Sequence, residues 1–505
     1  MAESRLGRVV VGAAPVVLAG LAYHGLRLTF FNADDFFHLY QVADGHTLER
    51  LFQPHGGHLL AVWHLVFAGF FHLFGIDATR WGLAVLATHL VNTALLWDVI
   101  RLLTGAPRLA AVLATCWATA AIQDGTLGWY SVYGQVLATT LLLLTLRSMQ
   151  RRREARPVPW PTLAAWWAAQ MAAAMCFGIG LAVAMALPVV ALVFLPAGAL
   201  DRPRRLALWS LPVALILVWI AAMLPFVGPG SATAAAGPKL LGVTLLYGPR
   251  FLVELIGTSA STVVLAPFTR ATLFPAPIAV AAALACAALV GVTAWRRPAT
   301  RRTLAALLVV IVVGYGSIAA GRAALYAAFS QVVQSGAYGP IEPRYHYLGT
   351  AVLAATLGTA VAPWLAAVPV ALASGAFIVF AGATAAALVL APLPLDHHDA
   401  ARRAVWRLFV QLGQAAKDAP PGATIRVPNK RFTPVGVMVV RDDAAFPGIA
   451  AVFLTWRPDG TLADHRILFE VADPAVLARL QADPAAPIAR IVTAPAAPTP
   501  PPPRP

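Results

Sequence analysis

Long apolar runs separated by short polar segments set the pattern of this chain from its N-terminus to about residue 391. Many of these runs hold about 20 residues, the length that a helix needs to cross the ~30 Å hydrocarbon layer of a membrane. We therefore expect about eleven transmembrane helices. They would cover residues 9–30, 81–103, 109–123, 133–149, 160–177, 180–198, 206–227, 276–295, 303–321, 346–362 and 364–391.

The basic residues between the apolar runs divide unequally over the two sides that these helices define. One side receives 16 Lys or Arg in short loops, and the other receives 8 in much longer loops. The positive-inside rule makes the first side cytoplasmic. The pattern thus predicts a multi-pass protein of the inner or plasma membrane, with the N-terminus in the cytoplasm and the C-terminus outside it.

Three segments do not fit a simple crossing. Residues 58–75 are apolar but hold three histidines, and a span here would reverse every later loop. We expect this segment to lie as a helix at the outer interface. Residues 228–275 predict a long external loop with partly embedded helices, and residues 322–345 predict a further external loop.

The composition of the chain changes after Leu395. Short strand-like runs at 423–427, 436–440, 449–456 and 466–471 follow a polar helical start, which predicts a small α+β domain over 396–492. The Pro-rich tail, 493–505, is expected to be disordered. The predicted fold is an all-α polytopic membrane domain, 1–395, with a soluble α+β domain on the extracytoplasmic side.

The composition excludes several classes of protein. Hydrophobic residues make up 59% of the chain and charged residues only 12%, although the net charge is +15. The arginines cluster in short loops, where they set topology and contact anionic membrane lipid, so no nucleic-acid partner is expected. Cys116, Cys176 and Cys286 lie within apolar runs, without the spacing of a zinc site or a disulfide framework.

An acidic pair gives the strongest indication of chemistry. Asp34 and Asp35 follow the first apolar run and open the predicted external loop 31–80. Two adjacent carboxylates are costly at a membrane face because like charges repel each other. We therefore predict that both are catalytic, with Asp34 as a general base. The alternative is that the pair caps a helix N-terminus.

Further polar residues fall on the same predicted side and are candidates for binding a substrate or a lipid phosphate. Arginine can bind a phosphate through two parallel hydrogen bonds. For Asp124 the alternative role is that of a plain loop residue. For Arg344 it is that of an anchor at the membrane interface, beside the neighbouring tyrosines. The candidates are His58, Asp124, Arg322, Glu342, Arg344 and Tyr345.

Three histidines of the external loop, His38, His55 and His58, have the composition of a metal cluster. Histidines that share one loop also commonly form hydrogen bonds or face water. No metal ligand is therefore assigned. A divalent metal is left open, and no other cofactor is indicated.

Several motifs resemble the membrane glycosyltransferases of the GT-C superfamily, in particular the protein O-mannosyltransferases and their transmembrane relatives with TPR repeats. In that group an acidic pair follows the first span, as Asp34 and Asp35 do here. The external loop of that group closes on a helix start similar to residues 87–92, Ala-Thr-His-Leu-Val-Asn. Its third span ends in an acidic residue followed by an aromatic one, as with Asp124 and Trp129.

A later loop of that family carries Glu-Arg-Tyr ahead of a span, and Glu342, Arg344 and Tyr345 resemble it with Pro343 inserted. The chain departs from the family in three ways. Asp124 lacks a preceding His-Pro, residues 177–180 (Phe-Gly-Ile-Gly) stand where a Lys-Glu often precedes the sixth span, and the C-terminal domain is not a TPR array.

The resemblance implies a transferase that moves a sugar from a polyprenyl-phosphate donor to a hydroxyl acceptor in the cell envelope, with inversion at the sugar carbon. In that reading Asp34 is the base, Asp35 orients the acceptor or shares a metal, and Arg344 with Arg322 holds the lipid phosphate. The alternatives are a transporter or flippase for lipid-linked sugars, which would place charged sites near the bilayer midplane, and a non-catalytic envelope-assembly protein.

Overall fold

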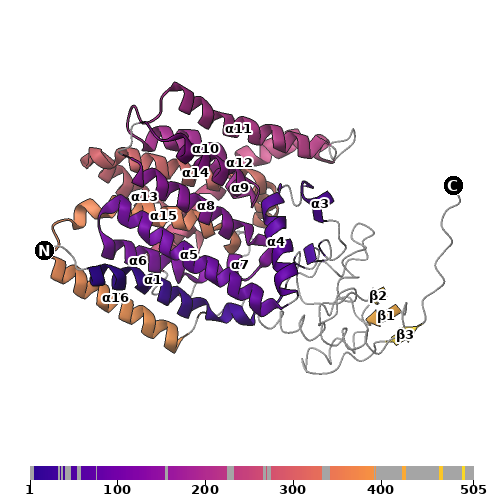
Figure 1. Cartoon of the computed structure of the whole chain (residues 1–505). Coiled ribbons are helices and arrows are strands. Elements are labelled where there is room, and N and C mark those ends of the chain that lie inside the picture. Colours follow the sequence, from indigo (N-terminus) through magenta and orange to yellow (C-terminus); the bar gives the residue numbers. More distant parts are fainter. Residues whose placement is uncertain are drawn as a thin grey trace.

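A computed structural model of the chain describes residues 5–31, 35, 38–39, 42, 47–53, 58–75, 77–153, 157–224, 232–265, 269, 274–332, 342–391, 393, 424–427, 466–469 and 492–494. Before residue 393 the described elements are helices (Figure 1). The α-helices are α1 (Arg5–Tyr23), α3 (Thr47–Arg50), α4 (Ala61–Phe74), α5 (Ala78–Thr104), α6 (Pro107–Ala118), α7 (Asp124–Leu127), α8 (Gly134–Arg151), α9 (Trp160–Ala174), α10 (Gly178–Phe194), α11 (Arg202–Met223), α12 (Ala232–Leu265), α13 (Ala276–Arg296), α14 (Arg301–Val332), α15 (Tyr347–Leu365) and α16 (Val370–Leu390). Short 3₁₀ turns are η1 (His24–Leu28), η2 (Ala121–Gln123), η3 (Tyr130–Val132), η5 (Pro298–Thr300) and η6 (Pro343–Tyr345).

Each apolar run that predicted a span coincides with a helix. Within the described ranges, eight segments are long and apolar enough to cross a membrane. The helices α6, α9 and α10 also lie on predicted spans but are shorter, with 12, 15 and 17 residues. The membrane part is therefore an all-helical polytopic bundle, as the sequence predicts.

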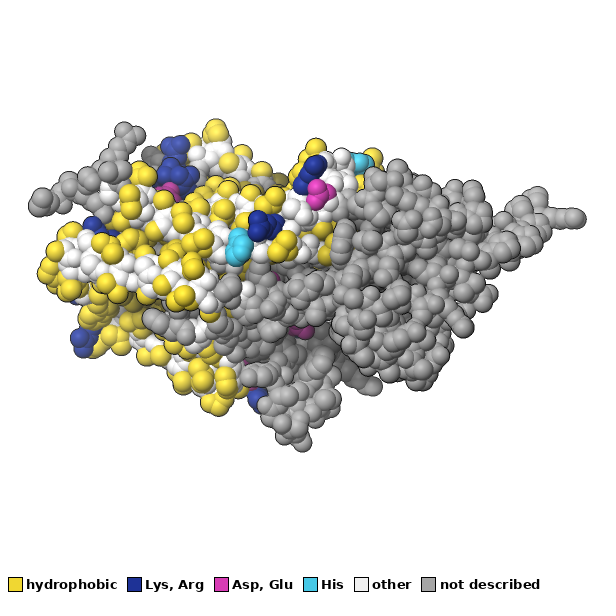
Figure 2. All heavy atoms as spheres, turned by 90° about the horizontal axis from the view of Figure 1, so that it is seen from below, with side chains coloured by type: hydrophobic (Ala, Val, Ile, Leu, Met, Phe, Trp, Pro, Cys, Tyr) yellow, Lys and Arg dark blue, Asp and Glu magenta, His cyan; other side chains and the backbone are white. Residues whose placement is uncertain are grey.

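The surface of the bundle has the character of a lipid-facing surface. Figure 2 shows hydrophobic side chains spread over one face of the bundle, with Lys and Arg mainly toward its edges. On α16, Leu372, Val379 and Leu390 are 64%, 71% and 85% exposed. Apolar side chains this exposed in a continuous helix are expected where the helix meets hydrocarbon rather than water.

One end of the bundle collects the segments predicted to be external, and we call it the loop end. A Cβ atom on Gly82 would lie 2.1 Å from the carbonyl oxygen of Leu26, so the end of η1 lies directly against the start of α5. The helix α4 packs at this same end. Its Val62 N–H donates to Met175 O (3.1 Å), and its Trp63 Nε1 donates to Tyr130 O (3.2 Å). Residues 61–74 are thus a helix that packs against this end of the bundle, and its position at the outer interface stays a prediction.

The opposite end collects arginines that the sequence assigns to the cytoplasmic side, and we call it the basic end. Asp98 accepts hydrogen bonds there from Arg101 Nη2 (2.5 Å), Arg147 Nε (2.6 Å) and Arg151 Nη2 (3.0 Å). Arg153 Nη1 lies 3.5 Å from Thr303 Oγ1 at the start of α14. Loops from distant parts of the chain therefore gather their positive charge at one end.

The helix α12 differs from the prediction for residues 228–275. A long external loop with partly embedded helices was expected, but residues 232–265 form a single helix of 34 residues. Small residues let α12 approach its neighbours closely: a Cβ atom on Gly257 would lie 1.9 Å from Ala279 O of α13. Ser259 Oγ lies 2.8 Å from His346 Nδ1. Tertiary packing thus stabilises a helix that the Gly- and Ser-containing sequence does not favour.

A buried polar network joins four helices in the core. His89 Nδ1 lies 2.8 Å from the hydroxyl oxygen of Tyr347, and Asn92 Nδ2 donates to Val136 O at 3.0 Å. Trp117 Nε1 donates to the backbone oxygen of Tyr347 at 3.1 Å. The motif at 87–92 was compared with a helix start, but it lies in the interior of α5. There it holds α5 against α6, α8 and α15.

Three short strands are described after residue 393: β1 (Thr424–Val427), β2 (Arg466–Phe469) and β3 (Val492–Ala494). They form a sheet in the order β2-β1-β3, with β1–β2 parallel and β1–β3 antiparallel. Two strand-like runs of the sequence coincide with β1 and β2, whereas those at 436–440 and 449–456 lie outside the described residues. The complete α+β domain stays a prediction, and β3 enters the first two residues of the predicted tail.

Candidate functional site at the loop end

Of the two residues of the acidic pair, the structure describes only Asp35. Asp34 lies outside the described residues. Asp35 is fully buried, and its Oδ1 accepts hydrogen bonds from the backbone N–H (2.6 Å) and the hydroxyl (2.5 Å) of Ser131. Ser131 belongs to η3, directly before α8. Asp35 therefore fastens the segment after the first span to the loop end of the bundle.

The second predicted acidic position lies beside the Glu-Pro-Arg-Tyr segment. Asp124 begins α7 and is 4% exposed. A Cβ atom on the next residue, Gly125, would lie 2.6 Å from Pro343 Cβ and 2.9 Å from Arg344 N. Thr126 Oγ1 donates to Arg344 O at 3.2 Å. Glycine at 125 is thus required for the close approach of α7 to η6, which joins two predicted site segments.

Arg344 is held by aromatic rings and one carboxylate. Its guanidinium carbon lies 4.8 Å from the ring centre of Trp129 and 5.5 Å from that of Tyr345. One of its nitrogens, Nη1, lies 3.7 Å from Glu342 Oε2, and its side chain is 26% exposed. Stacked rings fix the guanidinium without using all of its donors, so hydrogen-bonding capacity remains for a ligand.

A cavity of about 330 Å³ opens beside Arg344, and we call it the arginine pocket. Such a volume lies within the range of about 300–1,000 Å³ that is typical of small-molecule sites. One part of its wall is cationic or polar and the other is apolar. Its lining residues are His58, Gln135, Phe177, Gly178, Ile179, Leu181, Trp219, Ser317, Ile318, Gly321, Arg322, Arg344 and Tyr345.

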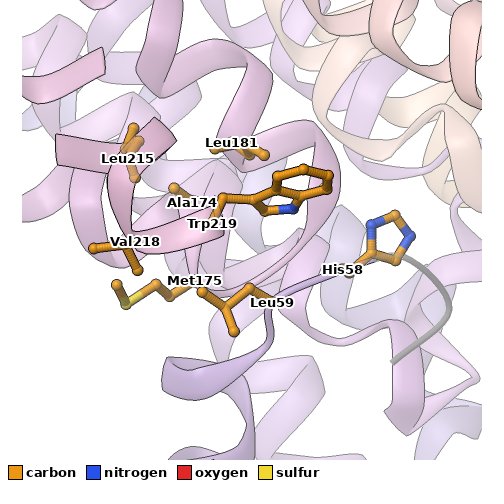
Figure 3. Close-up of a pocket in the computed structure, with 9 residues that line it drawn as sticks. His58, Leu59, Ala174, Met175, Leu181, Leu215, Val218 and Trp219 are labelled. Carbon is orange, nitrogen blue, oxygen red and sulfur yellow. The ribbon is translucent and has the colours of Figure 1, made fainter. Parts of the chain in front are cut away.

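His58 enters the pocket wall through contacts with the start of α10. Its ring stacks on Phe177 with ring centres 4.9 Å apart. A Cβ atom on Gly178 would lie 2.4 Å from His58 Nδ1, so only glycine leaves room for the imidazole. His58 also lines a neighbouring cavity of about 20 Å³ together with Trp219 (Figure 3). These two side chains therefore border both cavities.

The described residues offer no cluster of three or more His, Cys, Asp or Glu side chains that could hold a metal ion. Among the three loop histidines, His55 is outside the described part. The ring of His38 packs edge-on against Trp63, with centres 4.4 Å apart, whereas His58 stacks on Phe177.

Four of the predicted binding residues, His58, Arg322, Arg344 and Tyr345, line one pocket although they come from three separate segments of the sequence. Glu342 does not line the pocket itself, but its carboxylate lies 3.7 Å from Arg344, which does. Asp124 is not among the lining residues, although the helix that it begins, α7, packs against η6. Asp35 accepts hydrogen bonds from Ser131.

Sequence reasoning missed Gln135, Trp219 and the 177–181 segment as part of the site. A glutamine inside a predicted span was an available signal for Gln135, because buried amides are rare in apolar runs. The Phe-Gly-Ile-Gly segment was noted only as a departure from a family pattern. Its contribution to the pocket depends on the packing of α10 against α14, which no local pattern reveals.

No protein-family model matches the chain, and no curated protein is similar to it.

Proposed function

We propose that the chain is a membrane glycosyltransferase. It would transfer a sugar from a polyprenyl-phosphate donor to a hydroxyl of a protein or envelope glycan. The observation that carries this proposal is the arginine pocket, in which Arg322 and Arg344 face the same cavity as an apolar wall of Leu181, Trp219 and Ile318. This combination suits a ligand with a phosphate head and a hydrocarbon chain.

The proposed membrane arrangement follows the two ends of the bundle. Eleven helices cross the membrane, with α4 and α12 as additional helices on the external side. The basic end faces the cytoplasm because positive loops remain inside. The N-terminus is then cytoplasmic, and the loop end with its pocket, together with the small α+β domain at 396–492, is extracytoplasmic.

The acidic pair supplies the general base of the proposed reaction. Ser131 holds Asp35 only four positions before Gln135, which lines the pocket. Asp34 is the residue before Asp35 in the chain. In this arrangement a carboxylate and two arginines belong to one end of the bundle, as a base and a phosphate site require.

The proposed step is a single displacement. The acceptor oxygen forms a bond to the anomeric carbon of the sugar while the bond from that carbon to the phosphate oxygen breaks. Asp34 takes the acceptor proton, and the bonding electrons leave with the phosphate. Arg344 and Arg322 stabilise the charge that develops on the phosphate. The anomeric configuration inverts because the acceptor attacks from the opposite side.

The experiment uses the purified full chain in lipid nanodiscs. It is incubated with radiolabelled polyprenyl-phosphate sugars and an envelope extract as acceptor, and release of the lipid phosphate is measured. Transfer that is lost in Arg322→Ala and Arg344→Ala, but kept in Arg80→Ala, supports the proposal. Arg80 is a suitable control because it is exposed at the same end, paired with Asp77.

Two results would contradict the proposal. The first is that no donor in the panel is cleaved although the protein remains folded. The second is movement of intact lipid-linked sugar across the bilayer of reconstituted vesicles without cleavage, which would assign the chain to the transporters.

A further inference from the structure

Gln135 has an unusual environment for a buried amide. It lies in the first turn of α8, is 1% exposed and lines the arginine pocket. Its Oε1 is buried and has no hydrogen-bond partner among the described residues. Buried side-chain acceptors are normally paired, so an amide oxygen left unpaired in a pocket wall is suited to a ligand that donates a hydrogen bond.

Three other glutamines have a buried Oε1 atom, and comparison with them shows what is specific to Gln135. Gln123, Gln150 and Gln170 also have an unpaired Oε1. Each of them, however, donates through Nε2: Gln123 to Trp117 O, Gln150 to Leu102 O and Gln170 to Thr145 Oγ1. In the described part of the chain the side chain of Gln135 makes no such contact, and it alone of the four lines the pocket.

The chemistry of an amide indicates which part of a ligand it contacts. A fully ionised phosphate only accepts hydrogen bonds, so it is matched by Arg322 and Arg344 and cannot satisfy Oε1. A hydroxyl both donates and accepts, and it therefore matches both ends of an amide. The wall thus combines two cations for a phosphate with a neutral amide that suits a hydroxyl.

We propose that Gln135 binds a hydroxyl of the donor sugar and so distinguishes the sugar-bearing polyprenyl phosphate from the sugar-free product. This inference rests on the proposed function and names the specificity residue of its pocket. It also gives a reason for product release. After transfer the lipid keeps the phosphate but has no sugar hydroxyl for Gln135, so this hydrogen bond is lost.

The test measures binding of two probes to the purified full chain in nanodiscs: undecaprenyl phosphate, and the same lipid carrying one mannose or one glucose. Tryptophan fluorescence can report binding because Trp219 lines the pocket. The wild type should bind a sugar-bearing lipid about tenfold more tightly than the sugar-free lipid, the factor expected from one added hydrogen bond. Gln135→Leu should remove this preference and leave binding of the sugar-free lipid unchanged.

Gln170→Leu is the matched control, because Gln170 is also buried but does not line the pocket. It should keep the preference. Size-exclusion chromatography and thermal unfolding establish that each variant is folded, and Gln135→Met is the second variant if Gln135→Leu does not fold.

The outcomes separate this inference from the proposed function. A preference that persists without Gln135, or equal loss of both lipids, overturns the inference. A wild type that binds both lipids equally also overturns it but leaves the phosphate site in place. Failure of the wild type to bind either lipid overturns both the inference and the proposed function.

Discussion

Asp35 accepts two hydrogen bonds from a single residue, Ser131, which lies 96 positions further along the chain. One comes from the backbone N–H and one from the hydroxyl, and both end on Oδ1. The pair links the segment after α1 to the turn that precedes α8. Asp35 is thereby engaged in positioning this segment, whereas its neighbour Asp34 is assigned the proton transfer.

The first prediction concerns stability. Asp35→Ala removes both hydrogen bonds to Ser131 and should lower the free energy of unfolding by ~1.5–3 kcal/mol, the usual contribution of hydrogen bonds to a charged group. Ser131→Ala removes only the hydroxyl bond and should cost less. Thermal unfolding in detergent measures both, and Ser374→Ala on exposed α16 is the control. Strictly additive effects in the double variant would show that the two side chains do not interact.

The second prediction concerns the base. Asp34→Asn should reduce transfer by ~10²–10⁴-fold because an amide cannot take up the acceptor proton. Asp35→Asn should reduce it less, since the amide oxygen can still accept hydrogen bonds from Ser131. Initial rates with saturating donor, on protein of unchanged melting temperature, make the comparison. Transfer at the parental rate in Asp34→Asn would exclude it as the base.

The third prediction distinguishes a phosphate ligand from a membrane anchor at Arg344. Arg344→Lys keeps the charge but loses the planar pair of donors, so kcat/KM for the donor should fall, and Arg344→Ala should lower it further. An anchor predicts the reverse, because lysine also extends its charge to the headgroups. Arg80→Lys, at an exposed position of the same end, is the control and should have no effect.

The fourth prediction concerns the room beside His58. Gly178→Ala places a Cβ atom 2.4 Å from His58 Nδ1, so the imidazole has to move. Alanine also favours the start of α10 by up to ~1 kcal/mol, which offsets part of the cost. We therefore expect little change in melting temperature but a raised KM for the donor. Gly316→Ala is the control, since its Cβ would meet nothing within 4 Å. An unchanged KM would exclude His58 from donor binding.

The fifth prediction concerns topology. Cysteines introduced at Gly45 and Gly460 should react with a membrane-impermeant maleimide applied from outside intact cells, in a background with Cys286→Ser. Both positions belong to segments that the charge distribution assigns to the outside. Reaction at either position only after the cytoplasmic side has been opened would reverse the assignment of the two ends.

Local properties of the sequence are enough to locate most of the helices. The run that became α13 and the run that became α16 were found because membrane transfer depends on the summed hydropathy of about 20 neighbouring residues. The same holds for the loop arginines, such as Arg147 and Arg153, which were assigned to one side by counting charge. Neither the summed hydropathy nor the loop charge depends on which helices contact each other.

The sequence also identified Arg322 and Arg344 as candidates, but not their common cavity. That cavity exists because α10 packs against α14 while η6 lies against α7, an approach that Gly125 permits. The helix α12 was missed for a related reason. Its stability comes from contacts with α13 and α14, and these outweigh the weak helix propensity of its own residues.

The sequence by itself thus determined that this is an α-helical polytopic membrane protein, where most of its apolar helices lie, and which side chains are candidates for a functional site. Only the tertiary structure decided that Asp35 is engaged with Ser131 and that Gln135 lines a cavity with an unpaired amide oxygen. The physical reason is one of range. Hydropathy and charge are sums over neighbours in the chain, whereas a cavity and a buried hydrogen bond depend on the distance between atoms that many residues separate.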